Sequence, residues 1–220
     1  MSSRSVTQDP AGLRTGDVAP GTSARERIVA AACAAFTEHG FAAASTLEIA
    51  TRANVSKREL YSLFGSKQQL LVTCIAERAS RLALPAPRQA PRNRRELRAV
   101  LVQFGAVLLH ELSAPDVVAL YRLAVSEADR SPGVAQALDL HGRQAACAAL
   151  RKVLQAVRSA HTLDSAEIDA QVNRFMSALL DDVLMGLALG VRKRPGKNEI
   201  ARRAFEATET VVAFGARDRP

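Results

Sequence analysis

Apolar residues recur three or four positions apart along most of the chain between residues 25 and 214, and this spacing is typical of amphipathic helices. No stretch alternates apolar and polar residues strictly, and no Asn-Gly pair marks a hairpin turn. The pattern therefore predicts an all-α protein. We expect nine helices, at about residues 25–40, 45–53, 56–64, 66–82, 95–112, 115–129, 132–159, 164–190 and 197–214.

Two of the expected helices are short and close together. Ser45 and Glu48 have the Ser-x-x-Glu spacing of a capping box, which predicts that a helix starts there. Asn54 tolerates the left-handed conformation that ends a helix, and Ser56 can cap the next one. The sequence thus predicts two short helices joined by a three-residue turn, which is the size of a helix-turn-helix.

Three prolines, Pro85, Pro87 and Pro91, cannot continue a helix and mark a boundary between two parts of the chain. The residues before position 23 contain no apolar segment, so we expect neither a signal peptide nor a membrane anchor there. The expected divisions are a disordered N-terminal arm (1–22), a helix-turn-helix domain with its connecting helix (23–82), a Pro/Arg-rich linker (83–95) and a second helical domain (96–215).

The positive charge is concentrated in the first half of the chain. The 220 residues carry a formal net charge of +8 with a pI near 10.1. Residues 23–82 hold eight Lys or Arg against five Glu, net +3, and residues 83–95 hold four Arg, net +4, whereas residues 96–220 reach only +1. A basic first half favours a polyanion as partner. The three well-separated cysteines suggest neither a disulfide framework nor a metal site, and they fit a reducing cytoplasm.

The second short helix carries the candidate site. The second helix of a helix-turn-helix enters the major groove with its N-terminal residues at the base edges. If Leu60 and Phe64 face inward, the polar residues of this helix face outward, where Arg58 can pair with guanine and Glu59 can accept from cytosine. Lys67, at the start of the next helix, is placed for a phosphate. The spacing alone leaves DNA binding and a purely structural helical hairpin equally open.

The segment "ERIVAAACAAFTEHGFAAASTLEIATRANVSKRELYSLFGSKQQLL", residues 26–71, resembles the DNA-binding domain of the tetracycline-repressor (TetR) family. The resemblance implies an N-terminal three-helix domain joined by a long helix to a five-helix ligand-binding and dimerisation domain. It also implies that Tyr61 and Lys67 contact phosphates, that Ser45 or Thr46 adds a contact, and that positions 57–59 and 62 read bases. The DNA-binding residues that we expect are Ser45, Thr46, Ser56, Lys57, Arg58, Glu59, Tyr61, Ser62 and Lys67.

Three positions depart from the usual pattern of that family. Asn54 stands where glycine is common, Glu59 where a small hydroxyl residue is common, and Leu63 where an aromatic residue is frequent. Glu59 matters most, because an acid in the groove lowers DNA affinity unless a base or a neighbouring Arg satisfies it.

The segment "ALYRLAVSEADRSPGVAQAL", residues 119–138, is similar to the ligand-binding domain of the AefR-like branch of that family. The resemblance implies an effector pocket and a homodimer interface formed by the last two helices. Residues 175–190 suit that interface, but the same stretch could equally be an ordinary core helix. For the pocket we expect Phe104, Leu108, Tyr121 and Phe175, and for the interface Phe175, Leu179, Val183, Leu187 and Phe205.

The resulting hypothesis is a bacterial transcriptional regulator in the cytoplasm, at the nucleoid. It would be a homodimeric repressor that leaves a palindromic operator on double-stranded DNA when a small, mainly hydrophobic effector binds. A helical adaptor protein is the alternative, and an enzyme with a pocket in the second half is a weaker one. No catalytic, metal or cofactor motif supports an enzyme, since Asp181 and Asp182 are adjacent rather than helically spaced. The histidines are scattered, at His39, His110, His141 and His161.

Overall fold

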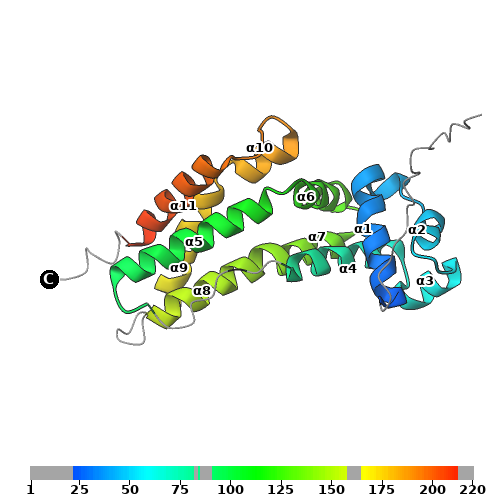
Figure 1. Cartoon of the computed structure of the whole chain (residues 1–220), viewed down its shortest axis with the longest axis horizontal. Helices are drawn as coiled ribbons and strands as arrows, with labels where there is room; N and C mark the ends of the chain where they lie inside the picture. The colour runs from blue at the N-terminus through cyan, green and yellow to red at the C-terminus, as the bar shows by residue number, and fades with distance from the viewer. Residues whose placement is uncertain (1–21, 82–83, 85–90, 158–164, 213–220) are drawn as a thin grey trace, which may run out of the picture.

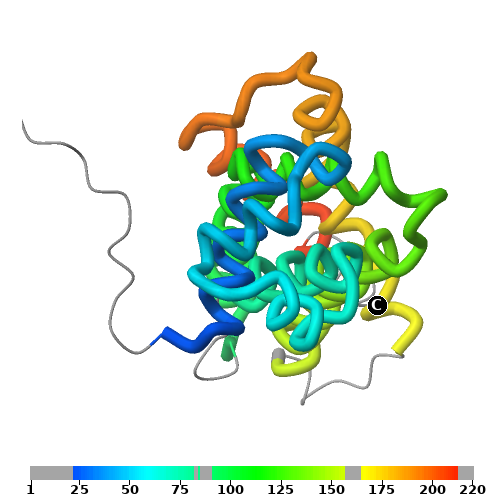
Figure 2. Tube along the Cα trace, turned by 90° about the vertical axis from the view of Figure 1, so that its right-hand side faces the viewer, coloured from blue at the N-terminus to red at the C-terminus, as the bar shows by residue number. Residues whose placement is uncertain are grey.

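The structure, a computed structural model, describes residues 22–81, 84, 91–157 and 165–212. The predicted N-terminal arm lies outside these ranges except for Thr22, and so does most of the predicted linker. The described part is all-α and contains no strand. Figure 1 shows an elongated molecule with α1, α2 and α3 gathered at one end and α5, α9 and α11 side by side at the other. Seen from the N-terminal end in Figure 2, the first helices lie in front of the rest of the chain.

The N-terminal domain contains the four helices that the sequence predicts. They are α1 (Ala24–Ala43), α2 (Thr46–Arg52), α3 (Lys57–Phe64) and α4 (Lys67–Ser80). A capping box between Ser23 and Glu26 starts α1, since Ser23 accepts from the Glu26 amide and the Glu26 carboxylate accepts from the Ser23 amide. The helical course of α1 is interrupted at Gly40, whose φ of +75° is easily adopted only without a Cβ atom.

The second domain is more finely divided than the sequence predicts. The expected helix at 132–159 contains a π-helical segment, and the expected helix at 164–190 breaks at Asp181, whose φ is +39°. The helices are α5 (Arg94–Leu112), α6 (Pro115–Glu127), α7 (Pro132–Leu138), the π-helical η1 (Asp139–Gln144), α8 (Ala145–Val157), α9 (Ser165–Leu180), α10 (Val183–Leu189) and α11 (Lys197–Val212).

Two apolar cores hold the described residues together. The first core is built from α1–α4, but it also contains Leu120 and Ala124 of α6 and Val134 and Ala137 of α7. The second core lies among α5, α8, α9, α10 and α11 and includes Val118 of α6. Helices α6 and α7 thus belong by sequence to the second domain but place residues in the first core, while Val118 of α6 packs in the second. Because α6 reaches both cores, its displacement is felt directly by the N-terminal domain.

Helix α5 packs closely on α9 and α11 at Gly105. A Cβ atom there would lie 3.1 Å from Phe175 and 3.2 Å from the Cβ of Ala204, which is tighter than ordinary packing. One residue earlier, Phe104 meets Phe175 edge to face, with ring centroids 6.1 Å apart. The absence of a side chain at Gly105 therefore allows the aromatic pair to fill the middle of the second core.

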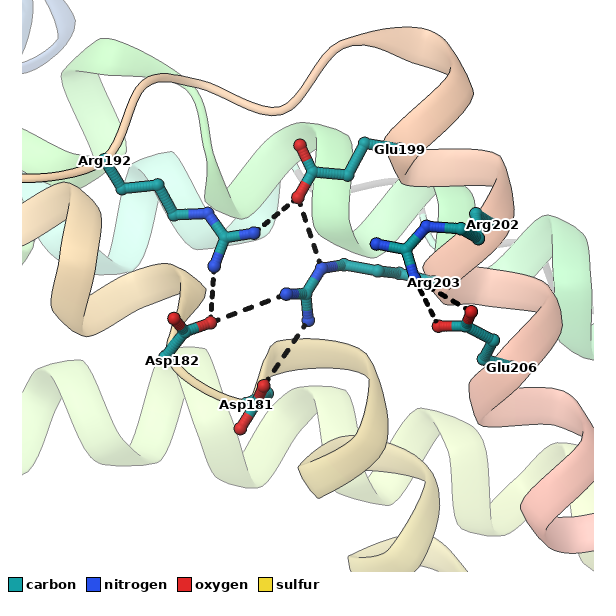
Figure 3. Close-up of polar contacts among 7 residues, drawn as sticks. All are labelled: Asp181, Asp182, Arg192, Glu199, Arg202, Arg203 and Glu206. Atoms are coloured by element: carbon teal, nitrogen blue, oxygen red, sulfur yellow. Dashed lines mark hydrogen bonds and ion pairs between the residues drawn. The ribbon is translucent and has the colours of Figure 1, made fainter.

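An ion-pair cluster fixes the break between α9 and α10 against α11 (Figure 3). Arg192 pairs with Asp182 and Glu199. Arg203 lies 3.4 Å from the Glu199 carboxylate, 3.5 Å from Asp182 and 3.9 Å from Asp181. The adjacent acids Asp181 and Asp182 are therefore charge partners of two arginines, in keeping with the expectation that they do not form an acid–base pair.

Replacing Glu199 with glutamine is expected to destabilise the protein at neutral pH but not at strongly acidic pH. The hydrogen bond from Arg192, with the charges of Arg192 and Arg203, keeps the pKa of Glu199 below its usual value. A carboxyl with a lowered folded-state pKa stabilises the protein above its unfolded pKa of about 4.3 and loses that contribution as the pH falls through the folded-state pKa. Urea denaturation of both proteins between neutral and acidic pH measures this difference.

The matched control for that experiment is Glu206→Gln, because Glu206 pairs only at the surface, 2.8 Å from Arg202 one turn away. This substitution should change the free energy of unfolding less than Glu199→Gln does at neutral pH. A Glu199→Gln effect of the same size at every pH would show that the carboxylate charge is not what stabilises the cluster.

No single helix in the described ranges is long and apolar enough to cross a membrane. Helices α5 and α6, which meet at an angle of 67°, reach that length and apolarity only when taken together. The large apolar residues of α5, including Leu101, Phe104 and Leu108, lie in the second core.

Candidate nucleic-acid interface

The turn between α2 and α3 has a fixed hydrogen-bonded geometry. Asn54 adopts the left-handed conformation that the sequence predicts, with φ +52°. The amide of Val55 donates to the carbonyl of Ala50 at 3.0 Å, and the Asn54 amide donates to Thr51 at 3.1 Å, which together form a Schellman motif. Ser56 Oγ then accepts from the Glu59 amide at 3.0 Å and caps α3, as expected.

Helix α3 is held by one apolar face and exposes its polar face. Leu60 and Phe64 are buried, which confirms the predicted orientation, and the guanidinium of Arg25 lies 5.5 Å from the Phe64 ring centroid. This face packs in the first core with α1 and α4. The residues left exposed on α3 are Lys57, Arg58, Glu59, Tyr61, Ser62 and Leu63.

Helix α2 is braced against α1 by charges. Arg52 donates to Glu38 at 2.8 Å and lies 2.6 Å from the Glu48 carboxylate, which is also 3.3 Å from His39 Nε2. The hydrogen bond from Arg52 lowers the pKa of Glu38. The capping box predicted at Ser45 is only half formed, because Ser45 Oγ accepts from the Leu47 amide while Glu48 turns to Arg52. The brace fixes the position of α2 relative to α1.

Tyr61 links α3 to the start of α2 on the exposed side of the domain. Its hydroxyl lies 3.3 Å from Thr46 Oγ1, and the ammonium of Lys57 lies 5.9 Å from its ring centroid. Ser45, the N-cap of α2, is exposed beside them. The structure thus brings the predicted residues of α2 and α3 together in one polar patch whose hydroxyls and ammonium suit phosphate oxygens.

Lys67 is half-buried and is less free than the sequence suggests. Its ammonium donates to the carbonyl of Ala42 at 3.4 Å and lies 4.6 Å from the ring centroid of Phe41. Burial lowers the pKa of Lys67, and the charge of Glu127 acts in the opposite direction. The start of α4 is therefore positioned against the end of α1, and the predicted phosphate contact of Lys67 stays a prediction.

A shallow groove runs beside α3 and includes residues that the sequence reading did not select. Ser23 and Arg25, from the first turn of α1, line it together with Arg58, Ser62 and Leu63. The Ser-x-x-Glu spacing of Ser23 and Glu26 indicates in the sequence that α1 starts there. It does not indicate that the start of α1 lies beside α3. The groove extends the candidate DNA surface from α3 to the first turn of α1.

The second domain contains a cavity of about 460 Å³ between α6, the α7–η1 segment and α9 with α10. Only Tyr121 of the four predicted pocket residues lines it. Phe104, Leu108 and Phe175 are fully buried in the second core, which corrects that prediction. The lining residues are Leu112, Val117, Val118, Tyr121, Ala124, Val125, Ala128, Ala135, Leu138, Asp139, Gly142, Arg143, Ala146, Met176, Leu180 and Leu184.

The polar part of the cavity lies on the π-helical segment. Arg143 donates to both carboxylate oxygens of Asp139, at 2.5 and 3.1 Å, and Gln144 donates to Asp139 at 2.7 Å. Hydrogen bonds from Arg143 and then Gln144 lower the pKa of Asp139. Because π-helical turns occur often at functional sites, their position here supports a binding role for the cavity.

The residues predicted for a dimer interface divide into two groups. Phe175, Leu179, Val183 and Leu187 are buried within the protomer, so they have almost no surface left for a second copy, and the structure does not support them as interface residues. Phe205 on α11 is 49% exposed. Sequence periodicity found the apolar face of α9 and α10 but could not show that α11 already packs on α9 and α6 on α10. Met185 and Leu189 on α10, and Val191 just after it, are further exposed apolar residues.

No group of three or more His, Cys, Asp or Glu side chains in the described ranges is placed to hold a metal ion. Cys33, Cys74 and Cys147 are free thiols, and His161 lies outside the described residues.

A braced helix-turn-helix with an exposed basic second helix, attached to a helical domain with an apolar cavity, defines a DNA-binding regulator of transcription. Comparisons with known proteins agree. Residues 28–74 match the family described as bacterial regulatory proteins, tetR family, and residues 99–215 match the AefR-like transcriptional repressor C-terminal domain. The chain therefore belongs to the TetR family, with an AefR-like C-terminal domain.

Individual relatives show the same class of protein, which consists of regulators and not enzymes. The chain is 36% identical over 104 residues to the HTH-type transcriptional activator FasR of Mycolicibacterium smegmatis, a match that spans 46% of this chain and only 47% of that protein. A TetR transcriptional regulator from Agrobacterium tumefaciens has a TM-score of 0.71 at 25% identity, covering 88% of this chain and 95% of that one. The flavonoid-responsive regulator FrrA has a TM-score of 0.70 at 26% identity, covering 87% and 96%.

Proposed function

We propose that this regulator is a homodimeric repressor that binds a palindromic operator and leaves it when a small, mainly hydrophobic effector occupies the second domain. The observation that carries the DNA part is the exposed face of α3, held in place by the buried Leu60 and Phe64. The matching C-terminal domain is described as that of an AefR-like repressor, whereas the relative FasR is an activator. The proposal of repression rather than activation therefore rests on the match to the AefR-like domain. Such a protein would act at the nucleoid in the bacterial cytoplasm.

In the proposed complex the first turn of α3 enters the major groove. Arg58 would read guanine and Glu59 cytosine, with Lys57 and Ser62 beside them. Tyr61, Thr46 and Ser45 would contact phosphates on one side. The groove lined by Ser23 and Arg25 would receive the DNA backbone on the other side of α3.

The cavity defines the class of effector that we propose. Its volume of about 460 Å³ suits a small organic molecule, and apart from Tyr121, Asp139 and Arg143 its lining side chains are apolar. An effector with a hydrophobic body and one or two polar groups would fit, the polar groups meeting Tyr121 or the Arg143 guanidinium. The name of the structural neighbour FrrA, a flavonoid-responsive regulator, is consistent with a molecule of this size.

A second copy is proposed because one helix-turn-helix reads too few base pairs for useful specificity. The exposed Phe205 on α11 would lie in the interface, where a homodimer would bury it. The two recognition helices would then face successive major grooves, and the operator would repeat the dimer's two-fold symmetry as a palindrome.

The deciding experiment is selection of bound sequences from random duplexes, followed by gel shifts with the selected site. Enrichment of a palindromic sequence, bound by a protein that light scattering shows to be a dimer, is the expected result. Retention of all duplexes alike, with no enriched sequence, would favour the alternative of an adaptor whose helix-turn-helix is only structural.

The effector site gives a separate prediction. Apolar compounds that raise the melting temperature should weaken operator binding, and operator should weaken their binding by the same factor, with a coupling of about 1–3 kcal/mol.

Ala135→Phe, which fills part of the cavity, should abolish the thermal shift while leaving operator affinity measurable. Gln136→Phe adds the same ring at an exposed position next to it and serves as control. Compounds that stabilise both variants equally would bind elsewhere.

A further inference from the structure

Arg78, in the last turn of α4, binds two acids of the second domain at once. Its Nε donates to Asp116 Oδ2 at 2.6 Å, and its Nη2 donates to Glu111 Oε2 at 3.2 Å. Only 21% of the Arg78 side chain is exposed, so solvent screens these charge-assisted hydrogen bonds less than it screens a surface pair. The end of α4 is therefore held to the second domain by two directed contacts.

The two acids lie on either side of the corner between α5 and α6. Glu111 is in the last turn of α5 and Asp116 is in the first turn of α6, and the two helices meet at an angle of 67°. Ser113, between them, is 1% exposed, and its amide donates to the Leu109 carbonyl at 3.1 Å. Because one guanidinium binds both arms of the corner, a change in the angle between α5 and α6 displaces the partners of Arg78.

The same corner forms part of the cavity wall. Leu112 directly follows Glu111, Val117 directly follows Asp116, and both line the cavity of about 460 Å³. Leu112 and Val117 also line a smaller pocket together with Arg78 and Glu111. These two apolar side chains thus border the cavity and the surroundings of Arg78, so a molecule that displaces them also displaces the neighbouring acids.

Helix α4 leads from this cluster to the recognition helix. It begins at Lys67, three residues after α3 ends at Phe64. Leu70 and Leu71 of α4 share the first core with Leu60 and Phe64 of α3. A packed helix transmits a displacement along its length. A shift at the Arg78 end of α4 therefore reaches the elements that hold α3.

We propose that Arg78 is the positioning residue through which a molecule in the cavity changes the setting of α3. This inference rests on the proposed function and names a residue through which the effector acts. In this structure Arg78 holds the end of α4 to the corner between α5 and α6. An effector that presses Leu112 or Val117 outward moves the two acids, and α4 follows them. The two recognition helices of a dimer then lose the spacing that successive major grooves require.

The test measures how far a cavity probe weakens operator binding by the full-length protein and by matched variants. The probe is anilinonaphthalene sulfonate (ANS), whose fluorescence rises in an apolar site, so that its own binding is measured directly. Arg78→Met removes the guanidinium and keeps most of the aliphatic side chain. Arg98→Met is the control, because Arg98 donates to both carboxylate oxygens of Glu209, at 2.7 and 3.0 Å, within the second domain.

The expected result is a loss of coupling in Arg78→Met alone. In the wild type and in Arg98→Met, saturating ANS should weaken operator binding at least about fivefold. In Arg78→Met, ANS should bind with its wild-type affinity but weaken operator binding less than about twofold. Arg78→Lys, which can keep one of the two contacts, should give an intermediate factor. A merely structural role would lower the stability of both Met variants and leave the factor unchanged.

An Arg78→Met protein that keeps the same factor as Arg98→Met would overturn the inference. If Arg78→Met does not fold, Asp116→Asn weakens the shorter contact from the other side and should reduce the factor, and an unchanged factor would again overturn the inference. A different result would count against the proposed effector site: ANS that binds Ala135→Phe as tightly as the wild type, or that leaves the operator affinity of the wild type unchanged.

Discussion

Replacing Phe175 with alanine is expected to lower the free energy of unfolding by about 3–5 kcal/mol, the usual cost of removing a large aromatic side chain from a core. Phe175 has no exposed surface and meets Phe104 edge to face. Gly105 also packs tightly against Phe175, since a Cβ atom on Gly105 would lie only 3.1 Å from the Phe175 ring. Urea denaturation followed by circular dichroism measures the loss.

The same substitution tests whether Phe175 belongs to the core, to the effector site or to a dimer interface. A core residue changes the stability of the protomer at every protein concentration. The control is Phe205→Ala on α11, an exposed ring whose removal should cost about 1 kcal/mol or less in protomer stability and should weaken dimerisation instead. A small loss for Phe175→Ala, together with a shift toward monomers, would contradict its placement in the core.

The sequence predicted the N-terminal domain well because local signals there agree with tertiary packing. Leu60 and Phe64 recur with helical spacing, Ser56 caps α3, and Asn54 takes the left-handed conformation that ends α2. Each of these features is set by a few neighbouring residues. Turn, cap and buried face could therefore be predicted without knowledge of the remaining chain.

The breaks in the second domain depend on contacts between distant segments. Asp181 interrupts a continuous apolar pattern because Arg192 and Arg203, from the following loop and helix, hold the adjoining acids. Nothing local at position 181 marks the left-handed residue. The π-helical turn at Asp139–Gln144 is likewise invisible to periodicity, since an extra residue in one turn changes the pattern only slightly.

The pocket residues were mispredicted for a related reason. Periodicity shows that a side chain is buried, but it cannot show whether the chain's own core, a ligand or a second copy covers it. Choosing large apolar residues such as Phe104 and Leu108 selected the core, which large side chains fill most completely. The cavity is lined instead by smaller residues such as Ala124, Ala128 and Ala135, which leave space unfilled.

Replacing Arg58 with alanine is expected to weaken operator binding by about 2–6 kcal/mol for the dimer, since each bidentate contact with guanine contributes about 1–3 kcal/mol and two copies of α3 take part. Arg58 is exposed in the first turn of α3, and the turn before it is fixed by the Ser56 cap. The rigid frame means that loss of the guanidinium should not be compensated by movement of the helix.

The effect of Arg58→Ala should depend on sequence, and this distinguishes base reading from general electrostatics. Binding to unrelated duplexes should weaken much less, because there the side chain contributes only its charge. Arg202→Ala on α11 removes the same charge far along the chain from α3 and should leave the preference for the operator unchanged. Anisotropy titrations of both variants at one salt concentration measure the ratio of operator to non-specific affinity. If that ratio is the same for Arg58→Ala as for the wild type, Arg58 contacts the backbone and the bases are read by other residues of α3.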